Sequence, residues 1–323
     1  MPANQHQSDQ FLSRWVKERY GERLRLPVFA APMFQVSGTD YVVESCRAGV
    51  IGAFPTVNCR SIEELEGWFE RIDSSLDEKC APYAVNLVVH PSNKRRDADL
   101  ELICRYKPEI VITSVGNPEP VLAPIQEYGG LVFADVATHR HAQKALEIDV
   151  DGLILLTAGA GGQTGWANPF AFARGVRQFF DGPIVLAGGI ADARAIRAAE
   201  VLGADFAYMG TRFLATKESL AQPRYKDMVR EAKFDDIKLT DKVTGIPANM
   251  LVASLIASGL DPDNLPERGA LNIENDINPN KSRPKQWKDV WSAGHSVELV
   301  EDVPTIAELV EALAKDYAAS TPW

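Results

Sequence analysis

Apolar residues in this chain occur in short continuous runs that recur at intervals of roughly 20 to 30 residues. Segments with the spacing of amphipathic helices lie between these runs. This alternation indicates buried parallel strands covered by helices, in an α/β fold. The runs predicted as strands span residues 27–33, 50–55, 83–89, 110–115, 131–136, 152–158, 183–189 and 206–211. They supply the eight strands of a closed (β/α)8 TIM barrel, and an open doubly wound sheet is the alternative.

The segments between the predicted strands carry helix signals. Ser61 and Asp192 are the predicted N-caps of two helices that cover the barrel. Near the end of the chain, Ile306, Leu309 and Leu313 have the spacing of a last barrel helix.

The pattern changes after the eighth predicted strand. Residues 218–299 are polar, contain several prolines and show helical stretches without strand runs. We therefore predict a mostly helical insertion that covers the barrel mouth as a lid. The barrel itself is predicted to comprise residues 1–217 and 300–323, including an N-terminal helix.

The predicted N-terminal helix has apolar residues at Phe11, Leu12, Trp15 and Val16. This helix either caps the bottom of the barrel or contacts a partner, and a homodimer is the partner we consider.

The composition narrows the location and the partners of the protein. A formal charge of −10 and a pI near 5.1 disfavour nucleic acid and anionic membranes as partners. No stretch approaches the roughly 18 apolar residues of a membrane span, and no secretory signal is evident. Cys46, Cys59, Cys80 and Cys104 lack the spacing of metal ligands and are expected to be reduced thiols. We expect a cytoplasmic protein that binds no metal and acts on a small-molecule substrate.

Barrel enzymes carry their chemistry at the C-terminal ends of the strands. Two glycine-containing turns follow the last two predicted strands, where many barrels hold a phosphate: Ala187, Gly188, Gly189, Met209, Gly210 and Thr211. Glycine lets backbone N–H groups approach an anion, so these turns favour a phosphate-bearing ligand. Two close-packed turns without a ligand are the alternative.

Polar and turn residues also end the earlier strands. Ala31, Pro32 and Met33 end the first strand and form either a surface for a flat ring or a simple strand terminus. Asn86 ends the third strand, where its amide makes either a ligand contact or an internal hydrogen bond.

The fifth strand ends at Asp135, which either binds a cofactor ring or substrate hydroxyl, or pairs with Arg140. His139 and His141 follow it and are expected to be solvated or structural.

The loop after the sixth strand has four glycines in eight residues, from Ala158 to Gly165. Gly161 and Gly162 allow the backbone to pass close to a planar cofactor, and Gln163 offers an amide donor and acceptor. A flexible lid is the alternative interpretation of this loop.

Together these motifs resemble the FMN-dependent nitronate monooxygenase (2-nitropropane dioxygenase) family, which also takes in the flavin enoyl-acyl-carrier-protein reductases. The matching features are APM, VNL, the glycine-rich loop, LAGGI, MGTRF and W-S-A-G at residues 291–294. The resemblance implies non-covalent FMN, with its ring between residues 31–33 and the loop near Gly161, and with Asn86 near the ring edge. It implies that the phosphate is bound by Gly188, Gly189, Gly210 and Thr211.

The chain departs from the family at Gln163, where the family usually has a histidine that is taken to act as a base or a donor. An amide cannot abstract a proton near neutral pH, so oxidation of neutral nitroalkanes is disfavoured. A nitronate is already an anion and needs no base. His295, which follows W-S-A-G, is the histidine that we consider as a replacement at the mouth, with a structural role as the alternative.

Three functions follow from the resemblance and this departure. The first is an FMN-dependent monooxygenase that oxidises alkyl nitronates with dioxygen. The second is an NAD(P)H-dependent FMN reductase or dehydrogenase that acts on a quinone, an enoyl thioester or a catabolic acyl-CoA. NAD(P)H then visits as a substrate, because the chain has no dinucleotide fingerprint. The third is a flavin-binding protein without turnover.

Overall fold

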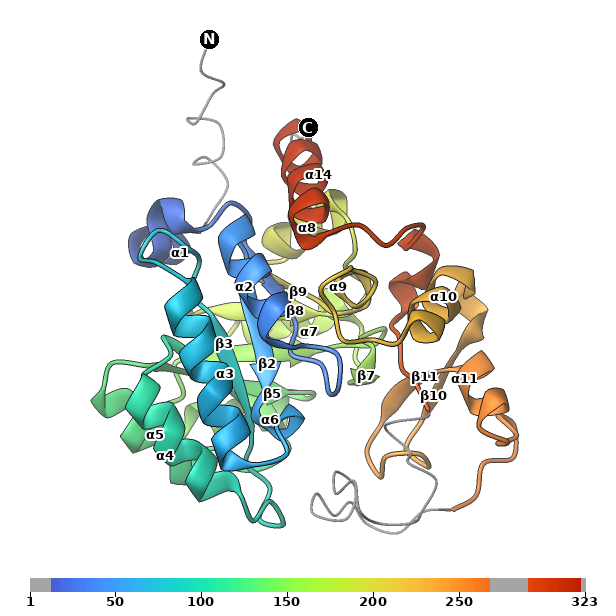
Figure 1. The fold of residues 1–323 in the computed structure, drawn as a ribbon, viewed down its shortest axis with the longest axis horizontal. Coiled ribbons are helices and arrows are strands. Elements are labelled where there is room, and N and C mark those ends of the chain that lie inside the picture. Colours follow the sequence, from blue (N-terminus) through green and yellow to red (C-terminus); the bar gives the residue numbers. More distant parts are fainter. Residues whose placement is uncertain (1–12, 268–289, 321–323) are drawn as a thin grey trace.

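The computed structural model describes residues 13–267 and 290–320 of the chain. Eight parallel strands close into a barrel (Figure 1), which confirms the predicted (β/α)8 fold. Strand β1 pairs with both β2 and β9, so the sheet has no free edge and the open doubly wound sheet is excluded. The barrel strands are β1 (Val28–Ala30), β2 (Ile51–Pro55), β3 (Ala84–Val88), β4 (Ile110–Ser114), β5 (Leu131–Val136), β6 (Gly152–Leu156), β8 (Ile184–Ala187) and β9 (Phe206–Met209).

Helices cover the outside of the barrel. The predicted caps are present: the Ser61 side chain accepts from the Glu64 backbone N–H at 3.1 Å, and Asp192 accepts from Ala195 at 2.8 Å. The barrel helices are α2 (Thr39–Ala48), α3 (Ile62–Ser75), α4 (Arg96–Tyr106), α5 (Glu119–Glu127), α6 (His139–Leu146), α7 (Pro169–Val176), α8 (Ala193–Val201), α9 (Thr211–Leu214) and α14 (Ile306–Ala319). Helix α14 packs against α2 and α8 through its buried apolar face, as predicted.

The N-terminal helix α1 (Arg14–Tyr20) closes the bottom of the barrel. The Trp15 ring packs edge-on against Phe133 and Phe206, with ring centroids 6.5 and 6.2 Å apart. Val16 is fully buried. Burial against the barrel therefore accounts for Trp15 and Val16, whereas Phe11 and Leu12 lie outside the described residues. The homodimer stays a prediction.

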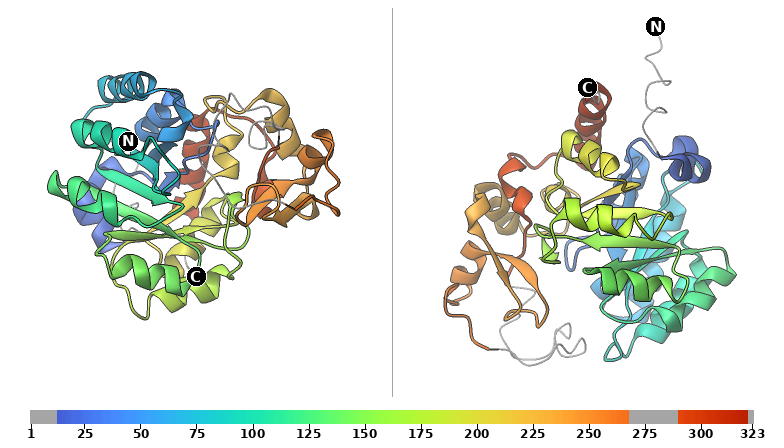
Figure 2. Two further views of the ribbon diagram at one scale, coloured as in Figure 1. Left: turned by 90° about the horizontal axis from the view of Figure 1, so that it is seen from below. Right: turned by 180° about the vertical axis from the view of Figure 1, so that it is seen from behind.

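The insertion differs from the expectation of a segment without strands. Helices α10 (Pro223–Glu231) and α11 (Val252–Ala257) are present, but so are strands β10 (Ile237–Thr240) and β11 (Ala248–Leu251). These strands pair antiparallel, and β11 also pairs with β7 (Gly162–Gln163), which lies in the loop after the barrel strand β6. Lys238 and Asn249 interrupt the apolar residues of β10 and β11, so no continuous apolar run reveals these strands, and β7 is defined only by its partner. The insertion lies beside the barrel (Figures 1 and 2) and is tied to it through this small sheet.

None of the described helices is long and apolar enough to cross a membrane. All four cysteines are free.

Candidate active site

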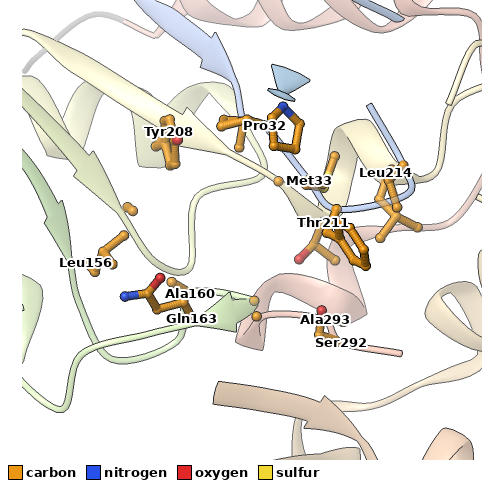
Figure 3. A pocket seen from close by; sticks show the side chains of 18 of the residues that line it. Pro32, Met33, Leu156, Ala160, Gln163, Tyr208, Thr211, Leu214, Ser292 and Ala293 are labelled. Carbon is orange, nitrogen blue, oxygen red and sulfur yellow. The ribbon is translucent and has the colours of Figure 1, made fainter. Parts of the chain in front are cut away.

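A cavity of about 250 Å³ lies at the C-terminal ends of the barrel strands, between the barrel and the insertion. The insertion contributes Tyr225, Ile246 and residues 290–293 to the wall. The barrel contributes strand ends and the loops that follow them (Figure 3). The predicted residues that line the cavity are Ala31, Pro32, Met33, Asn86, Asp135, Gly161, Gly162, Gln163, Ala187, Gly189, Gly210 and Thr211.

The turn after β1 is held rigidly. The Ser37 hydroxyl accepts from the Met33 backbone N–H at 2.9 Å and donates to the Ala31 carbonyl at 3.2 Å. The Asn58 amide donates to the Met33 carbonyl at 3.1 Å. Residues 31–33 therefore present a fixed surface to the cavity.

The two predicted phosphate-binding turns meet at one side of the cavity. Gly188 has φ +124°, and a Cβ there would lie 2.4 Å from Thr157 Oγ1, so the turn requires glycine. Gly189 has φ +73° and open space around it. Gly188 and Met209 lie behind the wall, whereas Gly189, Gly210 and Thr211 reach the cavity.

The glycine-rich loop after β6 is anchored. A Cβ on Gly161 would lie 2.7 Å from the Gly294 backbone N, and a Cβ on Gly294 would lie 2.4 Å from the Gly159 carbonyl O. The Asn249 amide, which is almost fully buried, donates to the Ala160 carbonyl at 2.7 Å. The loop is therefore a packed wall rather than a free lid, and the W-S-A-G segment forms its backing.

Asn86 makes the internal hydrogen bonds that we considered as an alternative. Its Nδ2 donates to Ser114 Oγ at 3.0 Å and to the Ile112 carbonyl at 3.3 Å. The side chain also lines the cavity, so a contact with a ligand ring edge stays a prediction.

Gln163 points into the cavity toward Leu156 (Figure 3), and its amide hydrogen-bonds to no described residue. The structure does not bring His295 to this cavity. Its ring packs against Phe234, with ring centroids 4.7 Å apart, and burial lowers the pKa of the imidazole. His139 and His141 lie on the outer helix α6. Among the described lining residues there is no histidine.

Asp135 lies at the end of β5 and faces the cavity. Its Oδ1 is buried without a hydrogen-bond partner, and burial raises the pKa of the carboxyl from 3.8 to about 7. Arg140 is exposed on α6 and forms no ion pair with Asp135, so that alternative interpretation is wrong.

Similarity to known proteins identifies the family of this chain. The nitronate monooxygenase family model matches residues 63–316, which is most of the chain. The chain belongs to the nitronate monooxygenase family. The members of this family are oxidoreductases that use a flavin.

Two curated relatives illustrate the range of the nitronate monooxygenase family. The chain is 27% identical to the (3aS,4S,5R,7aS)-5-hydroxy-7a-methyl-1-oxo-octahydro-1H-indene-4-carboxyl-CoA dehydrogenase of Rhodococcus jostii, over 72% of this chain. That alignment spans only 64% of the length of the relative. The chain is also 27% identical to a nitronate monooxygenase of Pseudomonas aeruginosa, over 91% of this chain and 96% of the relative.

Solved structures share the fold of this family member. FabK from Thermotoga maritima superposes with a TM-score of 0.76 at 22% identity, covering 95% of this chain and 97% of FabK. A nitroalkane oxidase from Streptomyces ansochromogenes superposes with a TM-score of 0.78 at 22% identity, covering 92% and 97% of the two chains.

The described residues fit a flavin of the kind that the family uses. The glycine turns offer close backbone approach for a phosphate, the turn at residues 31–33 offers a flat surface, and the cavity wall is largely apolar. The unpaired Oδ1 of Asp135 and the unpaired amide of Gln163 leave polar groups for a ligand to satisfy.

Several lining residues of this family member belong to none of the sequence motifs. Tyr208 follows Phe206 by two residues, so strand alternation predicts the same inward direction for both. Tyr225 stacks on Trp291 with ring centroids 4.9 Å apart, and its hydroxyl donates to the Ser292 carbonyl at 2.6 Å. This pairing joins the insertion to W-S-A-G and has no local sequence signal.

Val115 was also missed. It lines the cavity directly after β4 with φ +55°, which is strained for a β-branched residue. Such strain is typical of functional sites.

Proposed function

We propose that this protein binds FMN non-covalently in the cavity. The backbone at Gly188, Gly189, Gly210 and Thr211 would hold the phosphate, and the turn at residues 31–33 would face the ring. The support is the pair of glycine turns, one of which has no room for a side chain. Bound FMN supplies hydride or electron transfer, and the protein supplies position and electrostatics.

We further propose that the reaction is a dehydrogenation or reduction at an uncharged reacting group, such as the thioester end of an enoyl thioester or an acyl-CoA, or a quinone. One observation carries this choice: the described lining contains no lysine, arginine or histidine, and its one carboxyl is Asp135. An anionic reacting group beside Asp135, away from the backbone N–H groups of the glycine turns, would lose its hydration without gaining a cationic side chain, and it would face a carboxylate. A neutral thioester or quinone meets no such penalty. NADH or NADPH would serve as the hydride donor.

Oxidation of alkyl nitronates with dioxygen is the second candidate. It is supported by the family match over residues 63–316 and by similarity to the Pseudomonas aeruginosa enzyme over 91% of this chain. It also needs no base, which suits Gln163.

Anaerobic stopped-flow absorbance distinguishes these candidates. FMN-loaded protein is mixed separately with NADH, NADPH and propyl 2-nitronate, and free FMN at the same concentration is the control. We expect a nicotinamide to bleach the flavin faster than the nitronate does. Bleaching by the nitronate alone would establish the second candidate, and bleaching by none of the three would indicate a flavin-binding protein without turnover.

A further inference from the structure

Two strands place a carboxyl and a phenol on the inner side of the barrel. Successive strand residues point to opposite faces, so Asp135 shares the direction of Phe133 on β5, and Tyr208 shares that of Phe206 on β9. The rings of Phe133 and Phe206 both contact Phe29, with centroids 6.1 and 5.0 Å apart. Asp135 and Tyr208 therefore stand one layer nearer the mouth, and both line the cavity.

The groups that could neutralise Asp135 are few. The other titratable side chains of the described wall are Tyr208 from β9 and Tyr225 from α10, and Tyr41 from α2 lies behind β1. The Tyr41 hydroxyl donates to the Ala31 carbonyl, and the Tyr225 hydroxyl donates to the Ser292 carbonyl.

The Tyr208 hydroxyl hydrogen-bonds to no described residue. Burial raises the pKa of Tyr208 well above its usual value, and the charge of Asp135 contributes to that rise. Asp135 and Tyr208 are thus the titratable groups of the described wall that remain available to a ligand.

A purely structural role does not account for Asp135. A buried carboxyl oxygen without a hydrogen bond lowers stability, so the fold gains nothing from it. Gln163 cannot transfer a proton, and His295 lies outside the cavity wall. Among the described residues of the wall, Asp135 is therefore the side chain that can exchange a proton near neutral pH.

We propose that Asp135 is the group that exchanges a proton with the substrate, in place of the histidine that the family has at position 163, and that Tyr208 positions the substrate by a hydrogen bond. This inference rests on the proposed function. In reduction of an enoyl thioester, bound reduced FMN would supply the hydride to Cβ, and the Asp135 carboxyl would give its proton to Cα. Two electrons and two hydrogens are thereby added across the double bond, and the carboxylate remains. Oxidation of the saturated thioester is the reverse.

The first test does not depend on activity. Protein without FMN is labelled with ¹³C at the aspartate carboxyl carbons and titrated by NMR, with Asp135→Asn as the matched control. We expect one resonance that titrates close to neutral pH in the wild-type protein and is absent from the variant. A wild-type spectrum in which every aspartate titrates below about pH 5 would overturn the inference.

The second test measures the proton transfer. FMN-loaded protein is reduced with dithionite, and its reoxidation by crotonyl-CoA is followed without oxygen between pH 5.5 and 9. Because the acid form of Asp135 is required, the wild-type rate should fall about tenfold per pH unit above neutrality. Asp135→Asn should slow reoxidation by about 10²- to 10⁴-fold and abolish that pH dependence.

Two further variants separate the roles. Asp135→Glu should restore part of the rate and the pH dependence, whereas Tyr208→Phe should slow the reaction about tenfold and keep the pH profile. The FMN dissociation constant should change less than about threefold in Asp135→Asn. The inference would be overturned if Asp135→Asn kept the wild-type rate and pH profile. It would also be overturned if Asp135→Asn bound FMN more than tenfold more weakly. If the wild-type protein itself does not react with the thioester, the proposed function fails, and the NMR titration still decides the state of Asp135.

Discussion

The inner side of the barrel carries two layers of side chains on the same strands, and the layers have opposite properties. In the lower layer, Phe29, Phe133 and Phe206 are fully buried, and Trp15 packs beneath two of them. In the upper layer, Asp135 and Tyr208 face a cavity, and the Oδ1 of Asp135 is buried without a hydrogen-bond partner. A shift of two residues along one strand therefore separates positions that stabilise the fold from positions that are available for chemistry.

The lower layer should show the largest effect on stability. Phe133→Ala removes a fully buried ring and should lower the free energy of unfolding by about 3–5 kcal/mol, because the surrounding aromatic residues cannot fill the space. Urea denaturation of the protein without FMN measures this. The control is Phe170→Ala, the same deletion at a ring that is 62% exposed, which should change stability by less than about 0.5 kcal/mol. Equal losses in the two variants would contradict the assignment of the layers.

The glycine turn beside the upper layer should show the next largest effect. Gly188→Ala forces a side chain toward Thr157 Oγ1 and should weaken FMN binding about 100-fold, as measured by fluorescence titration.

Gly259→Ala is the matched control for Gly188→Ala. Gly259 also has a positive φ, of +76°, but it has open space around it and lies outside the cavity wall. FMN affinity should therefore be unchanged. An equal loss of affinity in both variants would show that backbone strain, rather than the turn itself, determines binding.

The effect of pH on stability through Asp135 is expected to be smaller than the effects of Phe133→Ala and Gly188→Ala. The folded-state pKa of Asp135 is raised from 3.8 to about 7, so its contribution is most favourable below pH 4 and is lost as the pH rises through 7. The wild-type protein without FMN should therefore become less stable relative to Asp135→Asn between pH 4 and pH 8. We expect a relative loss of about 1–2 kcal/mol, because water in the cavity offsets part of the roughly 1.4 kcal/mol per pKa unit. Parallel stability curves for the two proteins would contradict the buried state of the carboxyl.

The smallest effect on stability should come from Gln163→His. The amide has no described partner, so the free energy of unfolding should change by less than about 0.5 kcal/mol. The new imidazole adds a base to the cavity, and oxygen consumption with 2-nitropropane should appear. A stable, FMN-loaded variant without this activity would show that more than one side chain separates this chain from nitroalkane oxidation.

The barrel could be predicted from the sequence because its signals are local. Long apolar runs mark the buried strands, and Ser61 and Asp192 bind backbone groups only three residues away. The three-stranded sheet could not be predicted in this way. Lys238 and Asn249 interrupt the apolar residues of β10 and β11, and β7 is defined only by its pairing with Ala248 and Asn249.

The sequence predicts which residues belong to the candidate site. It does not predict how their side chains are oriented or paired. Parallel strands end together at one mouth of the barrel, so the sequence predicts which residues gather there. These are the glycine turns, residues 31–33, Asn86, Asp135 and Gln163. The direction of α6 carries Arg140 away from Asp135, and no local pattern reveals that. Strand alternation, counted from Phe206, could have identified Tyr208.

The most direct test of the account compares a neutral ligand with an anionic ligand of the same shape. Isobutyramide and isobutyrate are titrated separately into FMN-loaded protein at pH 8, and their dissociation constants are taken from the change in flavin absorption. A wall with a carboxylate and no described cation should bind the amide at least about tenfold more tightly. Equal or tighter binding of isobutyrate would contradict a site for uncharged reacting groups.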